Sequence, residues 1–107
     1  MSHYRAGRDR EYRTRDDMTE AGWEWIMRAS SSKGAADLLM AHEEHGAALV
    51  QVGGKSKTLG PAARARLLRA AWLCGALPIL AVAAPRQPIR YWQVSEGTAS
   101  TWTEWTP

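Results

Sequence analysis

Residues 30–57 read SSSKGAADLLMAHEEHGAALVQVGGKSK, and this stretch decides the fold. Two apolar runs, Asp37–Ala41 and Ala47–Gln51, have the length of buried strands, and a polar segment that ends in glycine, residues 42–46, separates them. Alternating strand signals around a short Gly-containing loop are typical of a β-hairpin. The sequence therefore predicts an antiparallel strand pair joined by a five-residue loop.

The loop length also predicts which residues face each other across this hairpin. If residues 42–46 form the loop, Ala41 lies opposite Ala47, and Asp37 lies opposite Gln51. Directly opposed side chains in an antiparallel pair have Cβ atoms about 5 Å apart. A carboxylate and a carboxamide oxygen would thus meet at the open end of the hairpin, where a hard cation could bind.

Length and composition favour a single domain. The 107 residues are 45% hydrophobic, which suffices for one modest core, and we expect one domain over residues 1–107. Residues 1–6 are expected to form a flexible arm, and residues 95–107 form a tail rich in Trp and Thr. No apolar run approaches the roughly twenty residues needed to cross a bilayer, and no signal peptide is evident. We expect a cytoplasmic protein in which the single cysteine, Cys74, serves in packing.

Positive charge is concentrated near the start of the chain. Residues 1–15 contain five arginines against Asp9 and Glu11, and the whole chain has a net charge of +3. Clustered arginine and lysine most simply indicate a polyanionic partner, of which nucleic acid is the commonest. A solvated basic face without a partner is the alternative on charge alone.

The remaining pattern predicts an α/β sandwich. Helices are expected at about 7–21 and 62–74, the second one after a Gly60 cap with Pro61 in its first turn. Strands are expected at 23–28, 37–41, 47–51, 77–83 and 89–94, which gives a mixed five-stranded sheet.

The tryptophans and the second helix carry further expectations about the core. Trp23, Trp25, Trp72 and Trp92 fall at strand or helix positions that favour core packing. Ala65, Leu68 and Trp72 are expected to form the buried stripe of the second helix. For Trp102 and Trp105 in the tail, core packing and a dimer contact both stay open.

Two motifs that could suggest other chemistry are set aside. The Gly54-Lys55-Ser56 segment lacks the first glycine of a phosphate-binding loop, since Leu49 occupies that position. The His42-x-x-His45 pair has no second pair of zinc ligands and is expected to be an exposed polar turn.

Several short stretches carry a resemblance to a known family. They are residues 7–12 (GRDREY), 22–23 (GW), 28–34 (RASSSKG), 37–39 (DLL) and 50–52 (VQV), then the helix after Gly60-Pro61 and the strand at 88–92 (PIRYW). In this order and spacing, the chain resembles the small Holliday junction resolvases of the archaeal type and their phage relatives, within the PD-(D/E)xK nuclease superfamily. The likeness covers about residues 7–94. It implies a restriction-endonuclease-like sandwich with two helices flanking the sheet.

The resemblance also implies a metal site. In that family a helix Glu, an Asp at the start of the second strand and an acid on the third strand bind magnesium, and a Lys follows two residues after that acid. By this likeness, Glu11, Asp37, Gln51 and the Val52 carbonyl would hold Mg²⁺, with Mn²⁺ as a substitute. The chain departs from the pattern at Gln51, which lacks a negative charge and should weaken cation binding.

The second departure is at Gly53, where the family has its lysine. That ammonium would orient the attacking water and stabilise charge on the phosphate. Lys55 has the same strand parity and lies roughly 6.6 Å further along, so we expect it to substitute. The expected catalytic set is Glu11, Asp37, Gln51 and Lys55.

The function implied is metal-dependent hydrolysis of four-way DNA junctions by a homodimer, since such junctions are two-fold symmetric. The residues expected to contact DNA are Arg5, Arg8, Arg10, Arg28, Ser31, Ser32, Lys33, Lys55 and Lys57. For a phage relative, the compartment would be the cytoplasm of the infected bacterial host. The alternatives are a catalytically impaired protein that binds branched or duplex DNA, and an interaction protein with no nucleic-acid role.

Overall fold

A computed structural model describes residues 3–29 and 34–107, with side chains from residue 6 onward. The elements in chain order are α1 (His3–Glu20), β1 (Glu24–Arg28), β2 (Leu38–His42), β3 (Gly46–Gly53), α2 (Pro61–Cys74), β4 (Ala76–Val82), β5 (Arg90–Gln93), the 3-10 helix η1 (Ala99–Thr101) and β6 (Thr103–Trp105). The first helix begins at His3 rather than Gly7. Residues 3–6 therefore belong to α1, which corrects the expected flexible arm.

The hairpin forms in the predicted register. β2 pairs with β3 antiparallel, and Ala41 lies opposite Ala47. The loop is shorter than expected, because His42 and Gly46 are themselves paired. At the other end Leu38 lies opposite Val50, where the regular pairing stops. The Asp37 N–H also donates to the Val50 carbonyl, so the predicted pairing of Asp37 with Gln51 does not continue the ladder.

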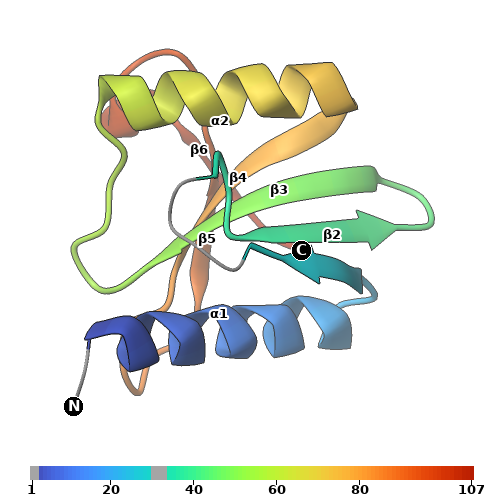
Figure 1. The fold of residues 1–107 in the computed structure, drawn as a ribbon, viewed down its shortest axis with the longest axis vertical. Coiled ribbons are helices and arrows are strands. Elements are labelled where there is room, and N and C mark those ends of the chain that lie inside the picture. Colours follow the sequence, from blue (N-terminus) through green and yellow to red (C-terminus); the bar gives the residue numbers. More distant parts are fainter. Residues whose placement is uncertain (1–2, 30–33) are drawn as a thin grey trace.

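The strands form one mixed sheet with the order β1-β2-β3-β4-β5-β6. All neighbours are antiparallel except β3 and β4, which are parallel and connected by α2. Figure 1 shows α1 and α2 on opposite faces of the sheet, which confirms the predicted α/β sandwich. The sheet has six strands rather than five, because the C-terminal tail adds β6. Neither described helix is long and apolar enough to cross a membrane.

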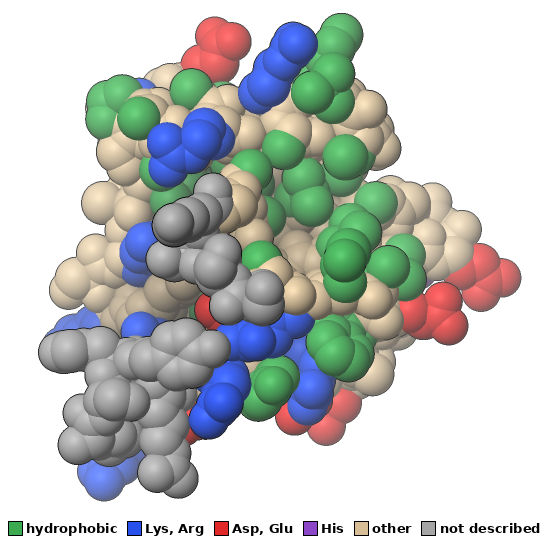
Figure 2. All heavy atoms as spheres, in the orientation of Figure 1, with side chains coloured by type: hydrophobic (Ala, Val, Ile, Leu, Met, Phe, Trp, Pro, Cys, Tyr) green, Lys and Arg blue, Asp and Glu red, His purple; other side chains and the backbone are tan. Residues whose placement is uncertain are grey.

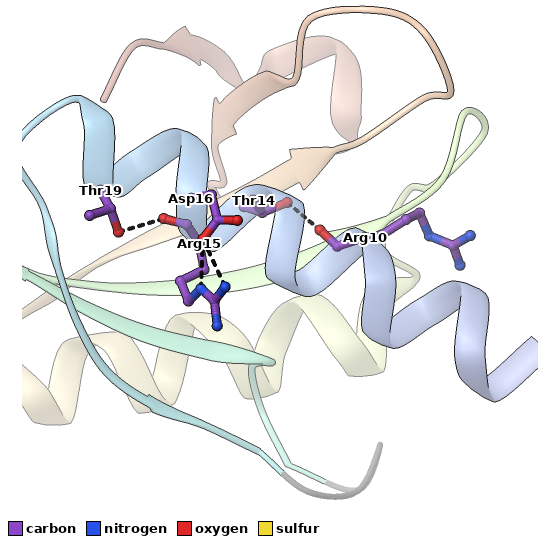
Figure 3. A network of polar contacts seen from close by, with 5 residues as sticks. All are labelled: Arg10, Thr14, Arg15, Asp16 and Thr19. Carbon is purple, nitrogen blue, oxygen red and sulfur yellow. Dashed lines mark hydrogen bonds and ion pairs between the residues drawn. The ribbon is translucent and has the colours of Figure 1, made fainter.

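On the α1 face, a narrow stripe of this polar helix meets the sheet. Met18 and Thr14, four residues apart, are fully buried there. The Thr14 hydroxyl donates a hydrogen bond of 2.8 Å to the Arg10 carbonyl, so its burial leaves no polar group unpaired (Figure 3). Asp16 pairs with Arg15 on the exposed side of the same helix. One stripe of α1 therefore packs against the sheet, while the charged residues on the other side of the helix remain in water.

On the α2 face, the buried residues differ from the predicted stripe. Leu67 and Ala71 are the buried residues of α2. Trp72 is 76% exposed, so the expectation that it packs in the core is wrong. The helix is rich in alanine, so the apolar pattern does not fix which side faces the sheet. Cys74 is also exposed, which corrects its expected packing role.

The edge strand β1 is less buried than predicted. Four of its five residues are exposed, Trp25 among them at 44%. Trp23 precedes this strand and is buried, as expected. An edge strand contacts only one neighbour, so its outer side chains stay accessible unless another element covers them.

The C-terminal tail belongs to the core. Trp102 is buried in the cluster on the α2 face, and its indole N–H donates to the Gly97 carbonyl at 2.9 Å. Trp105 packs against the cluster on the α1 face and contacts Trp23 and Tyr91, with ring centroids 5.5 and 5.7 Å apart. Of the two roles left open for these tryptophans, the structure shows core packing.

Candidate active site

Asp37 lies at the start of β2 and is held by the neighbouring strand. Its backbone N–H donates to the Val50 carbonyl at 2.9 Å, and its carboxylate accepts a 2.8 Å hydrogen bond from the Val52 N–H. Its carbonyl accepts from the Ala29 N–H at 2.9 Å, which ties the end of β1 to the same point. Three separate backbone connections thus fix the position of this carboxylate.

β3 carries the two other predicted oxygen ligands, the Val52 carbonyl and the Gln51 carboxamide. The N–H and C=O of one strand residue point to the same side of the strand, so the Val52 carbonyl faces the side on which Asp37 lies. Gln51 is partly buried, and no hydrogen bond to another described side chain or backbone group holds its carboxamide. The Gln51 carboxamide is therefore available to a ligand, and the Val52 carbonyl faces the same side of β3 as Asp37.

Glu11 approaches from α1 and forms an ion pair with Arg28, the last residue of β1. The distance from the Arg28 Nε to the Glu11 Oε1 is 2.7 Å, and the two side chains are only 17% and 15% exposed. Arg28, expected to bind DNA, is therefore engaged with a carboxylate of the candidate site. This pairing fixes α1 against the end of β1.

Burial raises the pKa of both carboxyl groups. For Glu11 the nearby negative charge of Asp37 raises the pKa further, whereas Arg28 and Arg10 oppose the shift. For Asp37 the opposing influences are the Val52 N–H and the positive charges of Lys57 and Arg28. Glu11 and Asp37 are thus close enough for one charge to disfavour the other, which a cation between them would relieve.

The donor set fits a magnesium ion. Among the described residues, no three carboxylate, imidazole or thiol groups converge on one point. Mg²⁺ usually binds through one or two carboxylates and keeps several waters, and it accepts carbonyl oxygens. Asp37 and Glu11, with the Gln51 carboxamide and the Val52 carbonyl, could hold such an ion.

The end of β3 shows where Lys57 lies. Gly53 is buried, and the atoms nearest to the place where its Cβ would stand all belong to the Lys57 side chain. Lys55, the substitute expected from the sequence, and Lys57 are both exposed and both line an adjacent hollow, but it is the Lys57 stem that lies against Gly53. Sequence reasoning assigned Lys57 only to DNA contact, because nothing in the sequence specifies how the turn after β3 folds.

Basic side chains of α1 lie close to the turn that follows β3. The Arg10 guanidinium lies beside Gly54, with three of its atoms 3.7 Å from where a Gly54 Cβ would stand. Its Nε is buried and has no hydrogen-bond partner in the described part of the chain. Figure 2 shows lysine and arginine side chains gathered around this region, between the two helices. The side chain of Arg5 is not described, and Ser31, Ser32 and Lys33 lie outside the described residues.

A hollow of about 410 Å³ borders the site on the α2 face of the sheet. Lys55, Lys57 and Arg90 contribute its cations, while Trp92 and Trp102 contribute aromatic surface. The Arg90 guanidinium lies 4.7 Å from the Trp92 ring centroid. A hollow with cations and aromatic rings can accept the backbone and bases of a nucleic acid strand.

The histidine pair stands apart from this site. His42 and His45 lie at the closed end of the hairpin, where their rings contact each other and Trp23. Backbone N–H groups of Glu44 and His45 donate to the His42 Nδ1, so this nitrogen serves the loop. The pair is a structural part of the turn.

No known protein family and no curated protein matches the sequence. The structure is similar to that of Hjc from Archaeoglobus fulgidus, a Holliday junction resolvase from an archaeal hyperthermophile. The TM-score is 0.68 at 18% sequence identity, and the similarity covers 90% of this chain and 93% of that chain. The fold is that of a Holliday junction resolvase. This likeness confirms the architecture that the sequence resemblance implied, and in this resolvase fold Glu11, Asp37 and Val52 lie together at the open end of the hairpin.

Proposed function

We propose that this protein is a magnesium-dependent endonuclease that cuts four-way DNA junctions in recombination and repair. The observation that carries the proposal is the Asp37 carboxylate, held by the Val52 N–H beside Glu11 in a resolvase fold. The structural neighbour is a Holliday junction resolvase, which supports the choice of substrate. A protein acting on such DNA would work in the cytoplasm, including that of a bacterial host infected by phage.

Each group of the site has a role in this proposal. Asp37 and Glu11, with the oxygens of Gln51 and Val52, would hold Mg²⁺ or Mn²⁺. The bound ion would activate a water molecule and neutralise charge on the phosphate. Arg28 keeps Glu11 oriented, and Arg8, Arg10 and Lys55 would bind the DNA backbone without reading sequence.

A nicking assay with an end-labelled four-way junction tests the proposal. We expect paired nicks with Mg²⁺ or Mn²⁺ and none with EDTA. Asp37→Asn should abolish nicking and retain junction binding, because it removes one charge and keeps a similar shape. Glu43→Gln removes a charge at the exposed, closed end of the hairpin and should nick normally.

The second candidate is a binder of branched or duplex DNA that has lost catalysis, and Gln51 and Gly53 favour it. It predicts tight, salt-dependent junction binding with no nicks at any Mg²⁺ or Mn²⁺ concentration. Failure to retain DNA at low salt would reject both candidates and favour an interaction protein.

We also propose that the protein acts as a homodimer, since a two-fold symmetric junction presents two equivalent sites. Figure 2 shows apolar side chains between α2 and the β1 edge of the sheet. Met27 on β1 and Leu73 on α2 are exposed, and Met27 lines a hollow of about 290 Å³ together with Leu39 and Ala70. A second copy would remove this surface from water.

Light scattering measures the mass of the protein in solution and tests the dimer. Leu73→Glu or Met27→Glu should convert a dimer into a folded monomer. Ala62→Glu, at the exposed start of α2, should leave the mass unchanged. A monomeric unmodified protein at high concentration would contradict the dimer.

A further inference from the structure

Lys57 occupies the space that a side chain at position 53 would take. A Cβ added to Gly53 would overlap the Cβ and Cγ of Lys57 and lie 2.6 Å from its Cδ. These atoms belong to the base of the lysine stem, which cannot swing away without moving the turn. The φ of Gly53 lies outside the left-handed region, so the backbone there would accept a side chain. Glycine therefore serves at this position to make room for Lys57.

A tight turn brings Lys57 back to the strand end. The Lys57 N–H donates to the Gly54 carbonyl at 2.9 Å, which closes a four-residue turn over residues 54–57. Side chains alternate along a strand, so the residue-53 position shares a face with Gln51. The turn thus places the lysine stem on the face of β3 that carries the proposed ligand Gln51.

Lys57 lies at the end of β3 that carries the candidate site. The Lys57 stem lies against Gly53, the residue after Val52, and the Val52 N–H donates to the Asp37 carboxylate. No ion pair ties the Lys57 ammonium to a carboxylate among the described residues. The Lys57 ammonium is therefore free to interact with a phosphate group at this end of β3.

We infer that Lys57 is the catalytic lysine of this site, supplied through the turn after β3 instead of from the strand position that Gly53 occupies. The inference rests on the proposed nuclease function and deepens it. In hydrolysis, the water oxygen bonds to phosphorus and the bond to the leaving sugar oxygen breaks. One water proton stays on the new phosphate, and the other goes to the leaving oxygen. Lys57 keeps its own proton and donates hydrogen bonds to the phosphate oxygens as their charge grows.

Single-turnover nicking separates Lys57 from Lys55. With protein in excess over the junction, Lys57→Ala should lower the nicking rate by about 10²-fold or more, the usual cost of losing one such donor. Lys55→Ala should weaken junction binding and should slow nicking much less than Lys57→Ala does. Each variant should reduce the salt dependence of binding by about one phosphate contact. Equal rates for Lys57→Ala and the unmodified protein, or a larger loss in Lys55→Ala, would overturn the inference while leaving the nuclease proposal intact.

Moving the lysine onto the strand is a stricter test. The double variant Gly53→Lys with Lys57→Gly should recover at least about tenfold of the rate lost in Lys57→Gly, since the new lysine then occupies the space that the Lys57 stem has left. Gly53→Ala alone should slow nicking by displacing Lys57. Gly54→Ala is the matched control, because the atoms nearest to its Cβ belong to the Arg10 guanidinium at an ordinary contact distance of 3.7 Å, and it should nick normally. If the double variant binds junctions but its nicking rate does not recover, the two lysine side chains do not occupy the same position.

Thermal unfolding in EDTA checks the geometry without catalysis. Gly53→Ala should lower the melting temperature relative to the unmodified protein, and combining it with Lys57→Gly should cost less than the two separate losses predict, because the overlapping Cβ and stem of residue 57 are then gone. Adding Lys55→Ala to Gly53→Ala should not raise the melting temperature. Identical melting temperatures for Gly53→Ala and the unmodified protein would refute the placement of Lys57. An unmodified protein that never nicks would overturn the proposed function and, with it, the role of Lys57, even if this coupling is found.

Discussion

The Val52 N–H donates a 2.8 Å hydrogen bond to the Asp37 carboxylate, so the acid at the start of β2 is held by the backbone of β3. This contact predicts different stabilities for two variants. Asp37→Asn keeps a carbonyl oxygen that can accept from Val52, whereas Asp37→Ala leaves this N–H without an acceptor. A hydrogen bond to a partly buried group contributes about 1–2 kcal/mol, so Asp37→Ala should be less stable than Asp37→Asn by that amount. Urea unfolding in EDTA measures the difference, and equal midpoints would contradict the role of this contact.

The raised pKa of Asp37 predicts how stability without metal depends on pH. Its ordinary pKa is 3.8, and burial raises the value in the folded protein. Between these two values the folded state binds more protons than the unfolded state, so stability falls as pH rises through the interval. Because Asp37→Asn lacks this titration, its stability relative to the unmodified protein should increase from pH 3.5 to 7. Unfolding curves at several pH values in EDTA measure this difference. A difference that stays flat with pH would contradict the raised pKa.

Magnesium should offset the loss of stability that is expected at higher pH in the absence of metal. A ligand that binds only the folded state at 100 times its dissociation constant adds about 2.7 kcal/mol. The ion needs ionised carboxylates, so its effect on the melting temperature should be larger at pH 8 than at pH 5. Asp37→Asn should lose most of the effect, and Glu43→Gln should keep it. Equal shifts in all three proteins would indicate binding elsewhere.

A hydrogen bond between Tyr91 and Asp17 connects β5 to α1. The Tyr91 hydroxyl donates a 2.6 Å hydrogen bond to the Asp17 Oδ2, and Tyr91 is only 3% exposed. Burial, together with this bond, raises the pKa of Tyr91. Tyr91→Phe should therefore cost about 1 kcal/mol of stability and leave junction binding and nicking unchanged. Chemical unfolding measures the cost, and an unchanged stability would show that water replaces the bond.

Local patterns in the sequence were sufficient to predict the centre of this fold. The loop between two apolar runs predicted the Ala41 and Ala47 pairing, and Gly60 with Pro61 predicted the start of α2. The position of Asp37 beside β3 follows from that register. These features depend on neighbouring residues in the sequence, which is why they could be predicted.

What could not be predicted depends on contacts between distant segments. The alanine-rich α2 could have turned either side to the sheet, so the exposure of Trp72 was missed. The strand β6 forms only because β5 lies beside it. The place of Lys57 over Gly53 depends on the turn at 54–57, whose composition would also allow an open loop.

Trp72, which the sequence wrongly placed in the core, and Trp105, whose role the sequence left open, provide the last prediction. Trp105, in the tail, contacts the rings of Trp23 and Tyr91, whereas Trp72, on α2, is 76% exposed. Replacing a packed tryptophan with alanine removes its aromatic contacts and leaves a cavity. Because Trp105 is only partly buried, Trp105→Ala should cost about 2 kcal/mol, below the full core value.

Trp72→Ala is the matched control, since it deletes the same side chain from a surface position. In a variant kept monomeric by Leu73→Glu, its effect should stay within about 0.5 kcal/mol. Chemical unfolding of both variants in that background gives the comparison directly. If Trp105→Ala were as mild as Trp72→Ala, the tail would contribute nothing to the core, and β6 would be dispensable to the fold. A larger loss at Trp72 than at Trp105 would instead mean that α2 packs through the side that the sequence first indicated.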